Sequence, residues 1–189
     1  KRPPEEQAAE RHRHLQHVIL VCRAIAFAHS KNVVHRDIKP QNIALGDFGQ
    51  VYVIDWGLAK DLTRYVAHAP DAVSEPSLGF GGTPGFVAPE IAARVTTSPQ
   101  TQQTFVVPKS HDGQPLTLEI ERRADIYGLG ATLYFVLTGS APYGVKLIEW
   151  LKLVATQDPV PPRQKDRSIP RPLEAICLKA LARDPQQRY

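Results

Sequence analysis

The sequence predicts a mainly α-helical domain that carries one small β-hairpin. Apolar residues recur at the spacing of an amphipathic helix over residues 12–30. Two short β-like runs, residues 42–45 and 51–54, flank a turn that contains two glycines, so we expect them to pair as a hairpin. A strongly apolar helical segment over residues 124–138 ends at Gly139 and is expected to be the buried central helix.

The segments around these elements are polar or irregular. Residues 1–14 contain two prolines and mixed charges, which is typical of a linker or of the start of a helix. A further β-like run covers residues 32–34. Residues 60–88 and 94–118 carry Pro, Ser, Thr and Gly without periodicity, which predicts long exposed loops.

The C-terminal part predicts two more helices, near residues 145–156 and 172–183. The five prolines of residues 158–172 lie between them and predict a stretch without regular structure, because proline interrupts helices and strands. At 189 residues the chain is long enough for one domain with its own core, which we place over residues 15–189.

Composition and charge narrow the class of protein. The net charge of +4 comes from scattered Lys and Arg residues without interleaved aromatics, so no nucleic-acid partner is expected. Cys22 and Cys177 lack the spacing of a metal or disulfide framework, which favours a reducing, cytoplasmic setting. The longest apolar run, residues 127–138, is too short to span a bilayer. The chain has no methionine, so we expect either a piece of a longer parent or a processed product, and a membrane anchor and dimerisation of the parent stay open.

The residues suited to chemistry concentrate in residues 35–42, which read His-Arg-Asp-Ile-Lys-Pro-Gln-Asn. This segment resembles the catalytic loop of eukaryotic-like Ser/Thr protein kinases, closest in wording to bacterial members, with Ile38 where leucine is usual. Further motifs in the family's order extend the resemblance from Leu15 to Tyr189. The resemblance implies a protein-kinase-like fold, of which this chain is the C-terminal lobe. It also implies transfer of the γ-phosphate of ATP to Ser and Thr hydroxyls of protein substrates.

Phosphoryl transfer explains why these residue types stand at this spacing. Asp37 is the candidate that orients the substrate hydroxyl and accepts its proton. Lys39 is expected to reach the γ-phosphate, and Asn42 offers an amide oxygen to Mg²⁺, which prefers oxygen ligands. His35 and Arg36 precede Asp37, and Arg36 marks the class in which loop phosphorylation creates a new arginine pair. The alternative reading, a charged solvated turn, is disfavoured by the match at eight positions.

The second metal ligand is either Asp47 or Asp55. Asp47 begins an Asp-Phe-Gly triplet, which is the usual metal-binding motif of the family, whereas Asp55 begins Asp-Trp-Gly. We choose Asp55, because the second strand of the hairpin must return before the metal ligand. Asp47 falls in the tight turn at the far end, where aspartate is an ordinary turn residue. Trp56 and Gly57 complete the chosen triplet, and the ring of Trp56, larger than the usual phenylalanine, is expected to pack beneath a helix of the missing lobe.

The resemblance places the activation segment over residues 55–90, closed by Ala-Pro-Glu at Glu90. Thr83 is expected to hydrogen-bond Asp37 and Lys39, a pairing that implies Ser/Thr specificity. The candidate phosphorylation sites and a co-ligand for the phosphate are Ser74, Ser77 and Lys60. An insertion around residues 96–115 is interpreted as either an idle surface segment, which we favour, or a partner surface.

Several matching residues have structural roles in the family. Asp125 matches the aspartate that starts the central helix and holds the backbone of the catalytic loop. Glu90 and Arg188 are expected to form a partly buried salt bridge. Ala44 lies where the C-terminal lobe touches the adenine of ATP.

No segment before Leu15 resembles the glycine-rich loop, the lysine strand or the glutamate helix that hold the ATP phosphates. We therefore expect a parent enzyme that uses ATP and Mg²⁺ and completes its site with an N-terminal lobe in cis. The 189 residues alone are expected to have negligible activity. Two alternatives are a pseudokinase that acts as a scaffold and a small-molecule phosphotransferase. The intact motif residues argue against the first, and the segment from Thr83 to Glu90 argues against the second.

Overall fold

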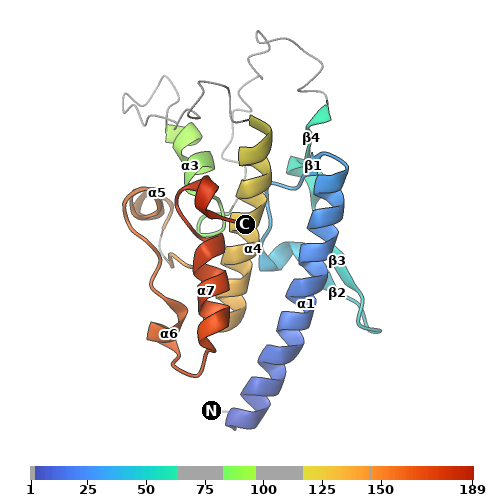
Figure 1. Ribbon diagram of the computed structural model, residues 1–189, viewed down its shortest axis with the longest axis vertical. Coiled ribbons are helices and arrows are strands. Elements are labelled where there is room, and N and C mark those ends of the chain that lie inside the picture. The colour runs from blue at the N-terminus through green and yellow to red at the C-terminus, as the bar shows by residue number, and fades with distance from the viewer. Residues whose placement is uncertain (1–2, 64–82, 97–116, 145) are drawn as a thin grey trace.

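Two long helices and a shorter one form the body of the molecule. In the computed structural model, which describes residues 3–63, 83–96, 117–144 and 146–189, helix α4 (Thr117–Thr138) is central. Helix α1 (Pro4–Ser30) packs along one side of α4, and α7 (Arg171–Ala180) packs along the other (Figure 1). The mainly helical class with a small hairpin is confirmed.

Helix α1 begins earlier than the predicted residue 12. Pro4 stands in its first turn, where backbone N–H groups have no partner within the helix, so the missing N–H of proline costs no hydrogen bond. Glu5 and Glu6 complement the positive end of the helix dipole. Val21, Ile25 and Ala28 recur at helical spacing and are buried. The polar start of the chain is therefore helix rather than linker from Pro4 onward.

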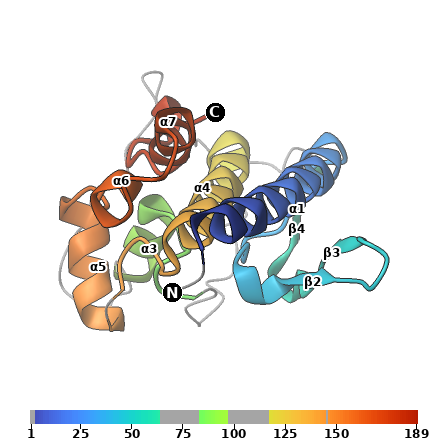
Figure 2. The ribbon, with the colours of Figure 1, turned by 90° about the horizontal axis from the view of Figure 1, so that it is seen from below.

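The predicted hairpin is present as β2 (Ile43–Leu45) and β3 (Val51–Val53), which pair antiparallel. Its turn closes through a hydrogen bond from Gly46 N to Gln50 O, and Gly49 adopts φ 80°, a left-handed conformation that favours glycine. Figure 2 shows that the hairpin projects on the α1 side, away from α5.

A second small sheet was not predicted. Strand β1 (Val33–Val34) pairs antiparallel with β4 (Lys60–Asp61), at the start of a segment that we expected to be an irregular loop. The paired positions are 26 and 28 residues apart in the chain, so no local sequence pattern predicts the pairing. The residues between β1 and β4 in the chain include residues 35–42 and the β2–β3 hairpin.

The helices of the second half differ from the prediction in three places. Helix α3 (Pro89–Thr96) was missed, and α4 begins at Thr117 rather than near residue 124, so the expected loop over 94–118 is helical at both ends. Helix α5 (Leu147–Thr156) and α7 agree with the predicted helices. The proline-rich stretch was wrongly expected to lack regular structure: α6 (Pro162–Lys165) is a short helix, because Pro162 occupies its first turn, where proline is tolerated.

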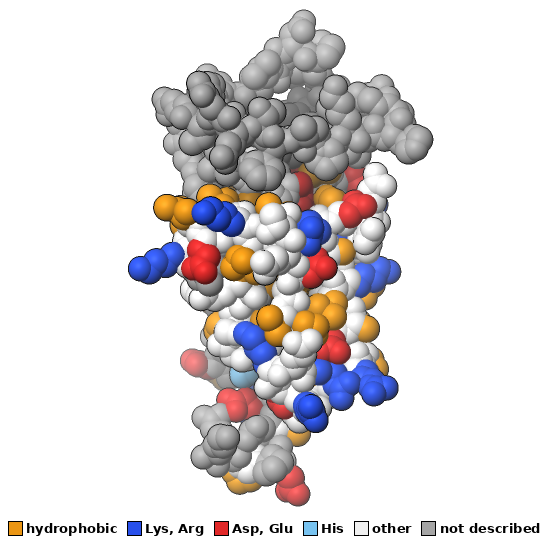
Figure 3. Space-filling view, turned by 90° about the vertical axis from the view of Figure 1, so that its left-hand side faces the viewer, with side chains coloured by type: hydrophobic (Ala, Val, Ile, Leu, Met, Phe, Trp, Pro, Cys, Tyr) orange, Lys and Arg blue, Asp and Glu red, His pale blue; other side chains and the backbone are white. Residues whose placement is uncertain are grey.

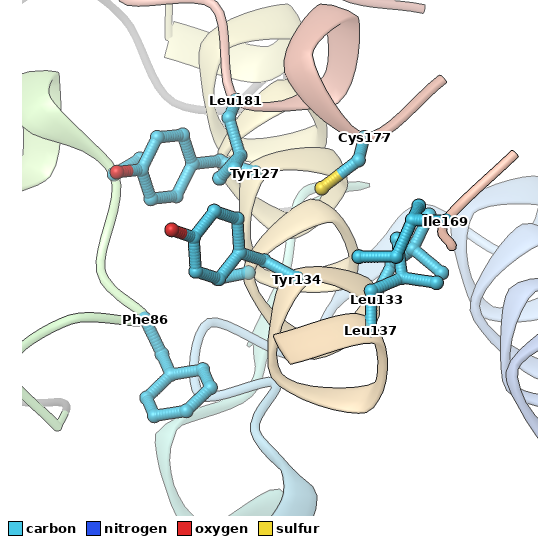
Figure 4. Packing of buried hydrophobic residues seen from close by; sticks show 10 residues of the cluster. Phe86, Tyr127, Leu133, Tyr134, Leu137, Ile169, Cys177 and Leu181 are labelled. Atoms are coloured by element: carbon cyan, nitrogen blue, oxygen red, sulfur yellow. The ribbon is translucent and has the colours of Figure 1, made fainter. Parts of the chain in front are cut away.

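The main core lies between α4, α7 and the segment before α3. Figure 4 shows Tyr127 and Tyr134 on one side of α4, and Leu133 and Leu137 directed toward Ile169 on the other. Gly130 allows the close approach of α7, since a Cβ there would lie 2.7 Å from the Cβ of Ala180.

The outer surface near α5 and α6 mixes charges. Figure 3 shows basic and acidic side chains interspersed with apolar ones on this face. Within the described ranges, the helices fall short of the length and apolar character that crossing a membrane requires.

Candidate active site

The loop between β1 and the 3₁₀ helix over Pro40–Asn42 is tied to the central helix by one carboxylate. Asp125 Oδ2 accepts a hydrogen bond from His35 N at 2.9 Å, and its Oδ1 accepts one from Arg36 N at 2.8 Å. Arg36 has φ 72°, a conformation that is strained for a non-glycine residue and needs such support. The expected contact of Asp125 with the loop backbone is therefore present.

The expected position of Asp125 at a helix start was wrong. It lies in the third turn of α4, because that helix begins at Thr117. Asp125 is 1% exposed and also lies 2.8 Å from Nε2 of His29, a contact that the sequence analysis missed. A buried carboxylate needs such partners, because an unpaired buried charge is costly.

The predicted residues of the loop lie together around Asp37. Lys39 Nζ donates to Asp37 Oδ2 at 2.6 Å and to Thr83 Oγ1 at 2.8 Å. Asn42 Nδ2 donates to the main-chain oxygen of Asp37 at 2.8 Å and to its Oδ2 at 2.9 Å. Thr83 thus reaches Asp37 through Lys39, and the start of the segment before α3 is joined to the catalytic loop.

The second carboxylate oxygen of Asp37 is not engaged by this cluster. Asp37 is 7% exposed, and its Oδ1 is buried without a hydrogen-bond partner in the part of the chain that the structure describes. A buried acceptor without a partner costs free energy unless a ligand supplies a donor. This oxygen therefore has unused capacity to accept a hydrogen bond from a ligand.

Asp55 and Asp47 lie at opposite ends of the hairpin. Ile54 N donates to Asn42 O at 2.9 Å, so Asp55 directly follows a residue that is joined to Asn42. Asp47 is exposed in the turn, next to Phe48, which is 90% exposed. Asp55 adopts φ 60°, a left-handed conformation that is concentrated at functional sites in non-glycine residues.

The residues after Asp55 support its carboxylate and the loop. A Cβ at Gly57 would lie 3.3 Å from Asp55 Oδ1, so glycine leaves that carboxylate uncrowded. The ring of Trp56 packs on His35 with 4.5 Å between centroids, and its Nε1 donates to Val53 O at 2.8 Å. The sequence analysis did not foresee this packing of Trp56 on the catalytic loop.

Comparison with known proteins decides the family. The family model of the protein kinase domain matches residues 5–189. This chain belongs to the protein kinase family. It is 36% identical over 182 residues to the serine/threonine-protein kinase PknD of Protochlamydia amoebophila, an alignment that covers 90% of this chain and 16% of that protein. It is 30% identical over 169 residues to the serine/threonine-protein kinase PknB of Mycobacterium tuberculosis, covering 89% of this chain and 22% of that protein.

A third relative gives the same picture. The serine/threonine-protein kinase PknD of Chlamydia abortus is 32% identical over 184 residues, which cover 89% of this chain and 17% of that protein. The chain therefore spans less than a quarter of the length of each of these curated relatives. The predicted membership of the Ser/Thr protein kinases is confirmed.

The oxygen ligands that Asn42 and Asp55 offer are chemically suited to a magnesium ion. Asn42 directs its Nδ2 to Asp37, which leaves its amide oxygen for a cation, and Asp55 is an exposed carboxylate next in the chain to the partner of Asn42. One amide and one carboxylate are enough, because Mg²⁺ keeps several waters and binds protein through one or two carboxylates together with phosphates. Within the described residues, no cluster of three or more His, Cys, Asp or Glu side chains is placed to hold a metal ion.

Glu90 and Arg188 form the expected ion pair, and it is fully buried rather than partly so. Arg188 Nη1 donates to Glu90 Oε1 at 2.7 Å, and Nη2 donates to Oε2 at 2.8 Å. The two side chains are 0% and 4% exposed. The guanidinium also lies 5.0 Å from the ring centroid of Tyr127, whose pKa is raised, mainly by burial. The pair joins the first turn of α3 to the C-terminal end of the chain.

Another ion pair of the kinase site was missed. Arg36 Nε lies 3.4 Å from Oε2 of Glu121, a residue of α4 that is 3% exposed. The only indication of this ion pair in the sequence was that Glu121 stands four positions before Asp125, a spacing that places both carboxylates on one face of a helix.

The remaining predicted residues are partly described. Ala44 faces Tyr52 in the hairpin register, and Lys60 faces Val34 in the second sheet. Both candidate phosphorylation sites, Ser74 and Ser77, lie outside the described residues, as does nearly all of the predicted insertion over 96–115.

Proposed function

We propose that this chain is the C-terminal lobe of a Ser/Thr protein kinase that transfers the γ-phosphate of ATP to protein hydroxyls. The observation that carries the proposal is the cluster around Asp37, in which Lys39 and Asn42 hold one carboxylate oxygen while the other is left for a donor. Phosphoryl transfer requires mostly positioning and electrostatic stabilisation, and this cluster supplies both.

In this proposal each side chain has one task. Asp37 Oδ1 accepts the hydrogen bond of the substrate hydroxyl and then its proton. Lys39 places its amino group beside the site of transfer, and its bond to Thr83 holds the segment on which the protein substrate would lie. The Lys39–Thr83 bond supports Ser/Thr specificity. A bound magnesium ion, held by Asn42 and Asp55, would neutralise the charge of the ATP phosphates.

The adenine and the N-terminal lobe belong to the same proposal. Ala44 on the hairpin is the expected contact of the adenine, and Leu45 and Tyr52 are exposed apolar side chains of that hairpin. A lobe that carries the glycine-rich loop would lie over this side of the molecule. We expect the 189 residues alone to transfer phosphate negligibly, since the parts that hold the ATP phosphates in line are not in this sequence.

The test uses the full-length protein with Mg²⁺-ATP and a generic protein substrate. Wild type should label Ser and Thr, and Asp37→Asn should lower kcat by roughly 10²–10⁴, the range for loss of a general base. The control is Asp47→Asn, which changes an exposed turn residue and should leave kcat unchanged. Circular dichroism checks that both variants are folded.

The outcomes separate the proposal from the scaffold alternative. Normal turnover by Asp37→Asn would remove Asp37 from its role. A folded wild type that binds nucleotide but transfers no phosphate would favour a pseudokinase. Turnover by the isolated 189 residues in the usual range of kinases, about 1–100 s⁻¹, would contradict the expected need for a second lobe.

A further inference from the structure

Arg36, the residue before Asp37, is fixed at two points by the same helix. Its main-chain N–H donates to Asp125 at 2.8 Å, and its side-chain Nε forms an ion pair with Glu121 Oε2 at 3.4 Å that lacks hydrogen-bond geometry. Its left-handed φ of 72° shows that this backbone depends on such restraints. The geometry of the loop in front of Asp37 is therefore coupled to the position of the Arg36 side chain.

Glu121 is suited to hold that side chain. It lies one turn before Asp125 on α4, so both carboxylates face the catalytic loop. The Glu121 side chain is 3% exposed, and a carboxylate buried to this degree requires a compensating cation. The guanidinium of Arg36 supplies that charge while its own side chain remains 32% exposed.

We propose that Glu121 is a positioning residue for the phosphotransfer. It acts through Arg36, for which its carboxylate is a counter-ion supplied by the fold itself. In many kinases a phosphate on the activation segment orders the loop by pairing with arginine. Here a carboxylate of α4 already pairs with that arginine, so the catalytic loop is held in place without a phosphate. This inference rests on the proposed kinase activity.

The experiment measures kcat and KM for ATP in the full-length protein before and after phosphatase treatment, with mass spectrometry to verify removal of phosphate. Treated wild type should keep kcat within about threefold, because the pair needs no phosphate. Glu121→Gln keeps the shape and removes the charge. In the treated protein it should lower kcat by about tenfold, equal to ~1.4 kcal/mol of transition-state stabilisation, with KM within about twofold.

The matched control is Glu119→Gln on the same helix. Glu119 is 65% exposed and pairs with Arg123, away from the loop, so its loss should leave kcat unchanged. A purely structural role of Glu121 would lower the unfolding temperature without changing kcat per folded molecule, and that result overturns the inference. A more than tenfold loss of kcat by wild type on phosphatase treatment overturns it as well.

A second variant covers a failure to fold. If Glu121→Gln does not fold by circular dichroism, Glu121→Asp keeps the charge on a shorter side chain. A fall of at least about threefold in its kcat at unchanged KM supports the inference, and an unchanged kcat overturns it. If wild type itself transfers no phosphate in either state, the proposed function fails. If wild type transfers phosphate and the Glu121 variant matches it, only the positioning role fails.

Discussion

Replacing Arg188 with methionine should destabilise the fold more than any loss of a surface ion pair. The guanidinium has five N–H groups, and each one has an acceptor in the structure. Two go to Glu90, and the others go to the main-chain oxygens of Arg123, Ala182 and Arg183, at 2.9, 2.8 and 3.2 Å. Arg188→Met keeps most of the length of the side chain but leaves Glu90 buried without its cation.

The magnitude follows from the burial of the pair. Because the Arg188 and Glu90 side chains are 0% and 4% exposed, water cannot replace the lost partner. Removing one partner of such a pair costs about 3–5 kcal/mol. For a chain of this size each kcal/mol lowers the unfolding midpoint by about 2–4 °C, so the midpoint should fall by at least about 6 °C. A lysine at this position offers three donors without the planar fork, so Arg188→Lys should not restore the stability.

The assay is thermal and urea unfolding followed by circular dichroism. The control is Arg183→Met, which breaks the surface pair with Asp158, whose side chains are 42% and 82% exposed. That change should cost no more than about 1 kcal/mol. The reasoning is refuted if the two variants have equal midpoints. It is also refuted if the changes in unfolding free energy caused by Glu90→Gln and Arg188→Met are additive in a double-mutant cycle, because the two partners of one buried pair should be coupled.

Two further predictions concern pH and nucleotide binding. Burial raises the pKa of Cys177 to about 12, whereas an unfolded thiol ionises near pH 8.5. The unfolded state therefore loses its proton first, so the stability supplied by this neutral thiol is complete below about pH 8.5 and declines as pH rises toward 12. Urea unfolding at several alkaline pH values should show that the unfolding free energy of Cys177→Ala falls less steeply with pH than that of wild type. Equal slopes for the two proteins would contradict the raised pKa of Cys177. In the full-length protein, Asp55→Ala should weaken Mg²⁺-ATP binding in calorimetry at least about tenfold, as loss of a metal ligand would, whereas Asp47→Ala should not. The reverse order would move the metal role to Asp47.

The sequence predicted those parts of the fold that have a local pattern. Apolar periodicity located α1 and α5, and the turn glycines located the β2–β3 hairpin. The pairing of β1 with β4 joins residues that are 26 and 28 positions apart in the chain, so no local signal exists. Helix α3 was missed: its first two residues were assigned to the end of the activation segment and its last three to the predicted loop over 94–118, although proline is tolerated in the first turn of a helix.

The site was predicted where the motif is continuous and missed where partners come from distant segments. Asp37, Lys39 and Asn42 lie within six residues of one another, and the structure brings them together. His29 and Glu121 were missed, because their partners lie 96 residues ahead and 85 residues behind in the chain. Such buried ion pairs cannot be predicted from the sequence alone, because they form only where α4 packs against the loop.

The contacts that hold the loop around Asp37 and the contacts that hold residues 83–90 converge on α4. On one side, Asp125 and Glu121 hold the backbone and side chain of the residue before Asp37. On the other, Arg188 binds the main-chain oxygen of Arg123 on α4 and both oxygens of Glu90. The segment from residue 83 to residue 90 is thus tethered at its start by the Lys39–Thr83 bond and at its end by Arg188. Since the contacts of Arg188 do not include Asp37, loss of Arg188 should release the end of the segment over residues 83–90 before it disturbs the cluster around Asp37.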